Sequence, residues 1–479
     1  MQVERELKFS LTPAAARRVA RQVHPAGPWR RRMVSNTYYD TQNERLRRAG
    51  VALRFRRDGT RRLQTLKADT SGAGGFSARA EWEIPAPRGR LDVGAFPREE
   101  ILAATGLDLG RLAIHLRPRF ETHFARRSTA VQVDGATRAE ICVDRGYVAA
   151  GGRREAISEI ELELKAGDSG SLLRYAAQIA KPLGLALEFE SKAERGYRVA
   201  AGAAFPSPRK WRRPRLGELA TPVDAFSAVF AAALSQAGAN ARGVAEGEDP
   251  EYLHQMRVGL RRLRSALLAF RDLVPRKAAQ PIADRLRGLM PPLGAARDWD
   301  VFCEALARAA APPALLARAR AKRASARRAA RQTARSAELQ AFLLRSLRWV
   351  DEGRWRARVS LIDFAKAALE RLHRKALKEA RSIDWADAER RHRLRIRMKR
   401  LRYACDFFSA SFAGAAARPY IKRLAALQDI LGDLNDISVA RRLLSELALP
   451  AGHLRLALAQ RERKLVTSLE AAWAAFEKR

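Results

Sequence analysis

Polar and apolar residues alternate in short runs over residues 1–200, and a period of two predicts β-strands. The first run contains Glu4, Glu6 and Lys8 at alternate positions. Because side chains alternate across a strand, these three charges leave on one face. Turn signals such as Asp58-Gly59 separate the runs that follow. Further strands are predicted at 51–56, 62–67, 80–84, 120–133, 139–143 and 157–164.

Three segments of the same region have helical spacing, at 13–23, 98–105 and 169–183. About eight strands with charged faces predict an antiparallel barrel flanked by these helices. Charges that point into a barrel are costly unless they hold a ligand. The fold class predicted for residues 1–200 is therefore α+β, with an eight-stranded antiparallel tunnel and flanking helices.

The second part of the chain is predicted to be a duplicated helical domain. Residues 201–216 are basic and rich in Pro, which is typical of a linker. From 217 to 479 the apolar spacing is helical throughout. His254–Arg264 reappears as His392–Arg402, 138 positions later. This repetition predicts an all-α domain of two duplicated bundles, at about 217–350 and 351–479.

Each copy carries a basic row beside its apolar stripe. In the first copy the stripe runs through Met256, Leu260 and Leu263. Like charges at helical spacing repel by ~0.2–0.5 kcal/mol per pair in an isolated helix, so two such rows invite an anionic ligand. The rows consist of His254, Arg257, Arg261 and Arg264, and of His392, Arg395, Lys399 and Arg402.

Composition strengthens the expectation of an anionic partner. Lys and Arg number 91 against 52 Asp and Glu, for a formal net charge of +39. The partner is expected to be a phosphate polymer or nucleic acid. The cysteines, Cys142, Cys303 and Cys405, lack the spacing of a zinc site or a disulfide framework. No apolar run approaches ~18 residues, so we expect a cytoplasmic protein without a membrane partner.

The charged rows of residues 1–200 resemble those of a known family. The matching segments are Glu4–Lys8, Tyr38–Thr41, Leu53–Arg56, Thr65–Lys67, Phe120–Phe124, Val143–Gly146, Glu159–Glu163 and Ser191–Tyr197. In combination they resemble a CYTH domain, the fold of the triphosphate tunnel metalloenzymes. The resemblance implies a tunnel that hydrolyses triphosphate compounds with Mg²⁺ or Mn²⁺.

The same resemblance implies roles for individual residues. The implied metal ligands are Glu4, Glu6, Asp144, Glu159 and Glu161, with Glu163 outside that shell. The phosphate chain would be held by Lys8, Arg54, Arg56, Lys67, Arg126 and Lys192. The residues implied in catalysis are Glu4, Glu6, Lys8, Arg54, Arg56 and Lys67.

The chemistry is coherent from the residue types alone. A metal bridging the oxygens of a triphosphate neutralises the charge that develops during transfer. A second metal or a carboxylate orients the attacking water. The cations fix the chain and stabilise the transition state electrostatically.

Residues 217–479 resemble a CHAD domain. The matching segments are His254–Arg264, Leu293–Asp298, His392–Tyr403 and Leu431–Asp436. The resemblance implies that the two basic rows bind inorganic polyphosphate in a cavity between the bundles. Asp298 and Asp436 are either metal ligands or, in better agreement with their setting, helix caps or partners of Arg side chains.

The leading hypothesis is a metal-dependent inorganic triphosphatase with a polyphosphate-binding helical domain, located in the cytoplasm with polyphosphate granules as a candidate site of association. One alternative is a non-enzymatic polyphosphate-binding protein whose tunnel only grips chain ends. Another is a tunnel that processes nucleotides or thiamine triphosphate, which ranks lower because no base-reading motif is visible. Nucleic acid is a less favoured partner of the helical domain.

Overall fold

The computed structural model describes residues 2–69, 76–214, 216–217, 220–381, 383–409, 412 and 417–477. Arg215 of the predicted linker lies outside the described residues. The chain divides into two compact units. The first contains residues 1–210, 234–243 and 336–353, and the second contains 211–233, 244–335 and 354–479.

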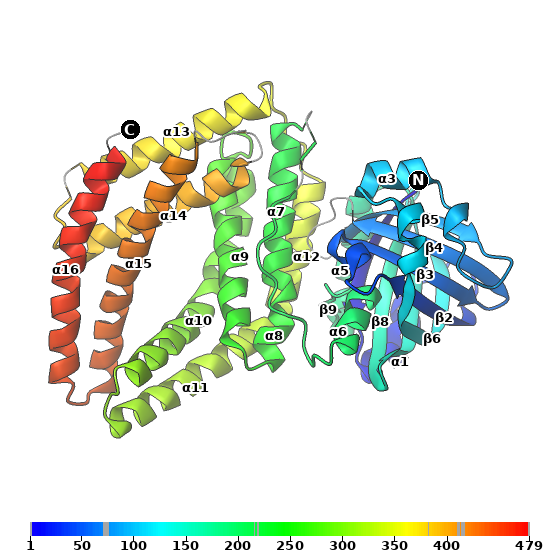
Figure 1. The fold of residues 1–479 in the computed structure, drawn as a ribbon, viewed down its shortest axis with the longest axis horizontal. Coiled ribbons are helices and arrows are strands. Elements are labelled where there is room, and N and C mark those ends of the chain that lie inside the picture. Colours follow the sequence, from blue (N-terminus) through cyan, green and yellow to red (C-terminus); the bar gives the residue numbers. More distant parts are fainter. Residues whose placement is uncertain are drawn as a thin grey trace. The chain divides into compact units, whose positions relative to one another are not determined.

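The first unit contains a closed antiparallel barrel (Figure 1). In the described residues the barrel has eight strands, and the pairing of β1 with β5 closes it. A two-residue strand, β9 (Ala186–Leu187), also pairs with β1. This closure confirms the predicted eight-stranded tunnel. In pairing order the strands are β5 (Phe76–Pro85), β4 (Arg61–Asp69), β3 (Val51–Asp58), β2 (Arg30–Asp40), β6 (Arg117–Gln132), β7 (Arg138–Ala150), β8 (Arg153–Ala166) and β1 (Gln2–Ser10).

The strand register gathers the charged residues on one face. Directly opposed residues of an antiparallel pair project to the same side. Lys8 opposes Glu161, and Asp144 opposes both Glu159 and Arg126. Followed around the barrel, this face carries Glu4, Glu6, Lys8, Tyr38, Arg54, Arg56, Lys67, Glu81, Glu83, Arg126, Asp144, Glu159, Glu161 and Glu163.

The opposite face of β3, β4 and β5 is apolar and packs against helices. Leu53, Leu66 and Trp82 form a buried cluster with Ile101 and Leu109. The charged face is therefore the inner one. The helices outside the barrel are α1 (Pro13–Gln22), α2 (Arg45–Arg48), α3 (Arg98–Thr105), α4 (Leu109–Leu112) and α5 (Ser169–Leu183), with short 3-10 helices at Val93–Ala95 and Ala113–His115.

One further helix, α6 (Lys192–Ala200), packs against the inner face of β6, β7 and β8. Tyr197 lies edge-on to Phe120, with ring centroids 5.0 Å apart. Its hydroxyl donates a hydrogen bond of 2.7 Å to Asp40. Gly196 permits this approach, because a Cβ there would lie 2.0 Å from the Phe120 ring. The helix thus occupies part of the barrel interior.

From Pro222 onward the described elements are helices (Figure 1). No described helix is long and apolar enough to cross a membrane. In chain order they are α7 (Pro222–Ala239), α8 (Ala241–Glu246), α9 (Pro250–Ala269), α10 (Arg276–Arg308), α11 (Pro313–Arg335), α12 (Ala337–Asp351), α13 (Leu361–Ala380), α14 (Ala388–Phe407), α15 (Ala417–Leu447) and α16 (Gly452–Glu477).

The helix bounds repeat with the offset seen in the sequence. Shifting α9 by 138 residues gives the bounds of α14, and α10 and α11 correspond to α15 and α16 within a few residues. The apolar stripes are buried in both copies, with Leu260 and Met398 each 0% exposed. This correspondence confirms the predicted duplication of helical bundles.

Candidate functional site

Three carboxylates converge inside the barrel, and we term them the acidic triad. Asp144 comes from β7, and Glu159 and Glu161 come from β8. One oxygen of each lies within 4.8 Å of the others, and all three residues are buried. Among the described residues no other group of acidic, His or Cys side chains is as compact. Oxygen ligands of this kind suit Mg²⁺ or Mn²⁺.

Two cations already balance the acidic triad. The Lys192 Nζ lies 2.7 Å from both Asp144 and Glu161 and also contacts Glu159. Arg126 donates hydrogen bonds of 2.7 and 2.6 Å to Asp144 and of 2.6 Å to Glu161. Burial disfavours the charges, but Arg126 and Lys192 outweigh it and lower the pKa of Asp144 and of Glu161. Asp144 and Glu161 are therefore ionised. The ammonium of Lys192 contacts the same oxygens that a divalent cation would use.

Glu4 and Glu6 lie on the same inner face but have other partners. Glu4 contacts Lys67, which also lies 3.3 Å from Glu81. Glu6 lies 3.8 Å from Arg79. Burial would lower the pKa of Lys67, but Glu4 and Glu81 raise it. In the described residues, Glu4 and Glu6 do not join the compact group that the acidic triad forms.

The other predicted phosphate ligands also line the interior. Lys8 is buried, and Arg54 donates a hydrogen bond of 3.4 Å to the Tyr38 hydroxyl. Burial, together with Arg54 and Arg126, lowers the pKa of Arg56 to about 10. Cations are therefore crowded in this part of the barrel, and an anionic ligand would relieve their repulsion.

Arg126 points into the barrel, whereas its neighbour Arg127 stacks on another residue. The Arg127 guanidinium lies 5.1 Å from the centroid of the Trp29 ring. Arg126 lies 5.5 Å from the Phe124 ring and pairs with the acidic triad. Both Arg126 and Lys192 hold carboxylates here, so either one can hold phosphate only by exchanging its partner.

Sequence reasoning missed two cations of α6. Arg195 lies 3.3 Å from Glu159, and Arg198 lies 2.7 Å from Glu190. The signal was present at 191–194, where Ser and Glu form a capping box that begins the helix. A helix from that point places side chains three residues apart on one face, which brings these cations beside the barrel's carboxylates.

The two predicted basic rows come together in the second unit, because α9 packs against α14. Burial and Arg261 lower the pKa of Arg257 to about 10. Burial, Arg395 and Arg261 lower the pKa of Lys399 to about 7. Cations from both copies therefore repel one another, and we term Arg257, Arg261, Arg395 and Lys399 the central basic cluster.

The remaining members of the rows differ in their exposure. Burial and Arg297 lower the pKa of His254 to about 4, so this ring is neutral near pH 7. His392, Arg264 and Arg402 are exposed. A neutral His254 can still donate one hydrogen bond to an anion.

Asp298 lies beside the central basic cluster, 3.8 Å from Arg257 and 3.2 Å from Arg442. Burial raises the pKa of Asp298 although both arginines oppose the rise. Its contacts are those of a partner that positions guanidinium groups. Arg297 and Arg442 were not singled out from the sequence, since no periodic pattern connects them with α9.

Comparisons with known proteins match two successive parts of the chain. The model described as the CYTH domain matches residues 2–197, and the model described as the CHAD domain matches residues 228–445. An inorganic triphosphatase of Haemophilus influenzae is 28% identical over 185 residues. That match covers 37% of this chain and 49% of the relative, so the chain spans about half the length of the curated relative.

Two solved structures are similar to separate parts of the chain. The CHAD domain of the plant Ricinus communis is 33% identical with a TM-score of 0.49, covering 57% of this chain and 97% of that one. A putative adenylyl cyclase from Hippeastrum, described as having a dominant triphosphatase activity, is 17% identical with a TM-score of 0.32. The match covers 42% of this chain and 98% of that one. On the two family matches, this chain contains a CYTH domain at residues 2–197 followed by a CHAD domain at residues 228–445.

Proposed function

We propose that the barrel hydrolyses inorganic triphosphate to diphosphate and phosphate. The observation that carries the proposal is the meeting of the acidic triad with rows of Lys and Arg on one inner face. An elongated inorganic anion and bound cations would balance these charges together. The similarity to an inorganic triphosphatase supports the same assignment.

The oxygen donors of the acidic triad fit Mg²⁺ or Mn²⁺, with Glu4 and Glu6 nearby on the same face. A bound metal would supply charge neutralisation on the phosphate oxygens. Lys8, Arg54 and Arg56 would bind the phosphate chain and hold it in line. A carboxylate that is not engaged with the metal would orient water and accept its proton.

Lys192 is the residue that must change partners during this cycle. Its ammonium contacts all three carboxylates of the acidic triad. Asp144, Glu159 and Glu161 would hold the metal, and the Lys192 ammonium, no longer needed by these oxygens, would turn to the incoming phosphate. Such an exchange keeps every buried charge paired, which matters because an isolated buried ion is costly.

For the helical domain we propose polyphosphate binding at the central basic cluster. The supporting observation is mutual repulsion among cations from both copies, which lowers the pKa of Lys399 and Arg257. A phosphate chain would supply the missing negative charge without any need for base recognition. Association with polyphosphate granules in the cytoplasm would follow from such binding.

A second candidate function is a barrel that grips the ends of polyphosphate without hydrolysis. The observation that favours it is the pairing of Lys192 and Arg126 with the acidic triad, which already balances the charges of Asp144 and Glu161. Turnover separates the two candidates, because only the first releases phosphate.

The experiment compares phosphate release by the full chain with that of the Glu4→Gln/Glu6→Gln variant. We expect the variant to lose hydrolysis of triphosphate with Mg²⁺ or Mn²⁺ and to retain polyphosphate binding by the helical domain. Glu99→Gln/Glu338→Gln removes the same charge from exposed helical positions and should hydrolyse normally. Full turnover by Glu4→Gln/Glu6→Gln would exclude both residues from the reaction.

A further inference from the structure

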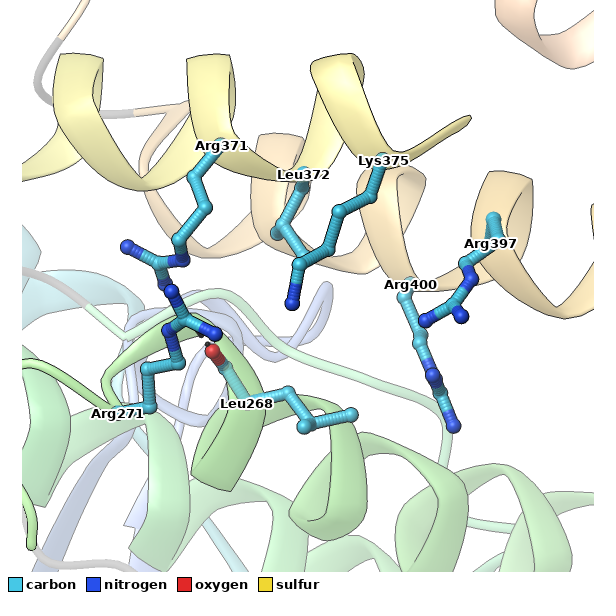
Figure 2. Close-up of a pocket in the computed structure, with 7 residues that line it drawn as sticks. All are labelled: Leu268, Arg271, Arg371, Leu372, Lys375, Arg397 and Arg400. Carbon is cyan, nitrogen blue, oxygen red and sulfur yellow. Dashed lines mark hydrogen bonds between the residues drawn. The ribbon is translucent and has the colours of Figure 1, made fainter. Parts of the chain in front are cut away.

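A second group of cations surrounds a pocket in the helical unit (Figure 2). It lies where α13 and α14 approach the end of α9. Figure 2 shows Lys375 extending downward from α13 and the two arginines of α14 extending downward from α14, above Leu268 and Arg271 at the end of α9. The lining residues are Leu268, Arg271, Arg371, Leu372, Lys375, Arg397 and Arg400.

This pocket is distinct from the central basic cluster. A helix turns by roughly 100° per residue. On α14, the mean direction of Arg397 and Arg400 therefore lies roughly 150° from the mean direction of Arg395 and Lys399. The two groups of cations use different faces of the same helix.

The cations of the pocket are crowded and only partly balanced. Burial, Arg271 and Arg397 lower the pKa of Lys375. Burial and Arg397 lower the pKa of Arg400 to about 10. Within the described chain, neither Lys375 nor Arg400 forms an ion pair. Lys375 and Arg400 are therefore available to form ion pairs with an anion in the pocket.

Neighbouring contacts hold other cations in place. Arg371 contacts Asp272 and donates a hydrogen bond of 2.9 Å to the carbonyl oxygen of Ala269. Arg397 lies 3.5 Å from Glu379. Guanidinium groups fixed in this way are preorganised for an oxyanion, since less side-chain entropy is lost on binding.

The repeat fold does not require this pocket. The 138-residue offset places Ala233 at the position of Arg371 and Ala237 at the position of Lys375. Both alanines are 0% exposed. Gly259 stands where the second copy has Arg397. At these three positions one copy buries small residues where the other presents cations to a hollow, whereas Arg262 stands at the position of Arg400 and pairs with Asp406.

We propose that this pocket binds a phosphoryl oxyanion separately from the central basic cluster. The ligand is either free orthophosphate or the terminal unit of a polyphosphate chain, because both offer the same charged oxygens to Lys375 and Arg400. The site does not depend on hydrolysis by the barrel.

Acylation of lysines in the full chain tests the site directly. The reagent is an amine-reactive ester at matched ionic strength, and mass spectrometry measures the labelling of Lys375 with orthophosphate, with polyphosphate, or with chloride alone. Lys366, exposed on the opposite side of α13, is the internal control. We expect several-fold protection of Lys375 and none of Lys366.

Protection by orthophosphate identifies the free ion as a ligand, and protection by polyphosphate alone identifies the chain end. Equal labelling in all three solutions, or equal protection of Lys366, would overturn the proposal. Calorimetric titration of the protecting anion then compares Lys375→Gln/Arg400→Gln with Lys366→Gln/Arg418→Gln, a pair with the same loss of charge. We expect roughly tenfold weaker binding, equivalent to about 1.4 kcal/mol, at the pocket for the first variant only. Equal affinities would also contradict the pocket.

Discussion

The barrel interior and the central basic cluster hold their charges in opposite ways. In the barrel, Lys192 and Arg126 lie within hydrogen-bonding distance of carboxylates. In the cluster, Arg257 and Lys399 repel neighbouring cations, and the pKa of each is lowered. The cations paired with the acidic triad must exchange partners to bind a ligand. The central basic cluster gains a partner on binding, as the crowded Arg54 and Arg56 of the barrel also would.

This difference distinguishes a site suited to catalysis from a site suited only to binding a polyanion. A site with internal ion pairs can bind a metal and an anion together, because each replaces a charge of its own sign. A site with excess cations binds any polyanion of suitable shape and is sensitive to salt. The two regions should therefore respond differently to mutation, metal and pH.

The largest expected effect is in the central basic cluster. Replacing Arg257, Arg261, Arg395 and Lys399 by Glu should weaken polyphosphate binding by roughly 1,000-fold or more, because each charged hydrogen bond contributes about 1.5–3 kcal/mol. Fluorescence anisotropy with labelled polyphosphate measures the affinity. Triphosphate hydrolysis by the same protein is the control and should persist; unchanged affinity would place the polyphosphate site elsewhere.

The next largest expected effect is a loss of thermal stability in the Lys192→Gln variant. Breaking a buried ion pair costs about 3–5 kcal/mol, so thermal stability in a chelator should fall. Mn²⁺ should raise the melting temperature of this variant more than that of the unmodified protein, since the metal can replace the missing ammonium. Lys181→Gln, at an exposed position of α5, is the control. An identical Mn²⁺ shift in all three proteins would refute the exchange of cations.

A smaller loss of folding stability is expected from Gly196→Ala, which tests the placement of α6. The added Cβ would meet the Phe120 ring at 2.0 Å, and overpacking of this kind costs about 1–3 kcal/mol. Urea unfolding measures the change. Gly217→Ala introduces the same methyl group where nothing lies within 4 Å and should be near neutral. Equal stability of the two variants would show that α6 is not held against Phe120.

The smallest effect is a pH dependence of polyphosphate binding. The lowered pKa of Lys399, about 7, means that its charge is lost as pH rises above neutrality. A bound anion favours the protonated form, so affinity should be highest below pH 7 and should fall severalfold between pH 7 and 9. Lys399→Arg keeps its charge over this range and should flatten the profile. A slope that survives in Lys399→Arg would assign the titration to another group.

Much of the barrel was predictable from the sequence because its charged positions alternate. The helices Arg98–Thr105 and Ser169–Leu183 were predicted with the bounds observed. Strand β2 was not predicted, since its buried face carries polar Asn36 while Met33 is 62% exposed. That reversal of hydropathy conceals the period of two.

The candidate site was predictable only in part. Alternation placed Glu4, Glu6 and Lys8 on one face, which the register confirms. It could not show which carboxylate meets which cation. The acidic triad is balanced by Lys192, which comes from a helix that follows the barrel strands in the chain. Partners brought together by tertiary packing leave no local pattern.

The most direct test of the central claim is phosphorus NMR of the full chain incubated with inorganic triphosphate, with Mg²⁺ or Mn²⁺ and with a chelator. The account predicts that triphosphate disappears only with a divalent metal and that diphosphate and orthophosphate appear in equal amounts. Triphosphate that stays intact with both metals, in a preparation that still binds polyphosphate, would contradict it.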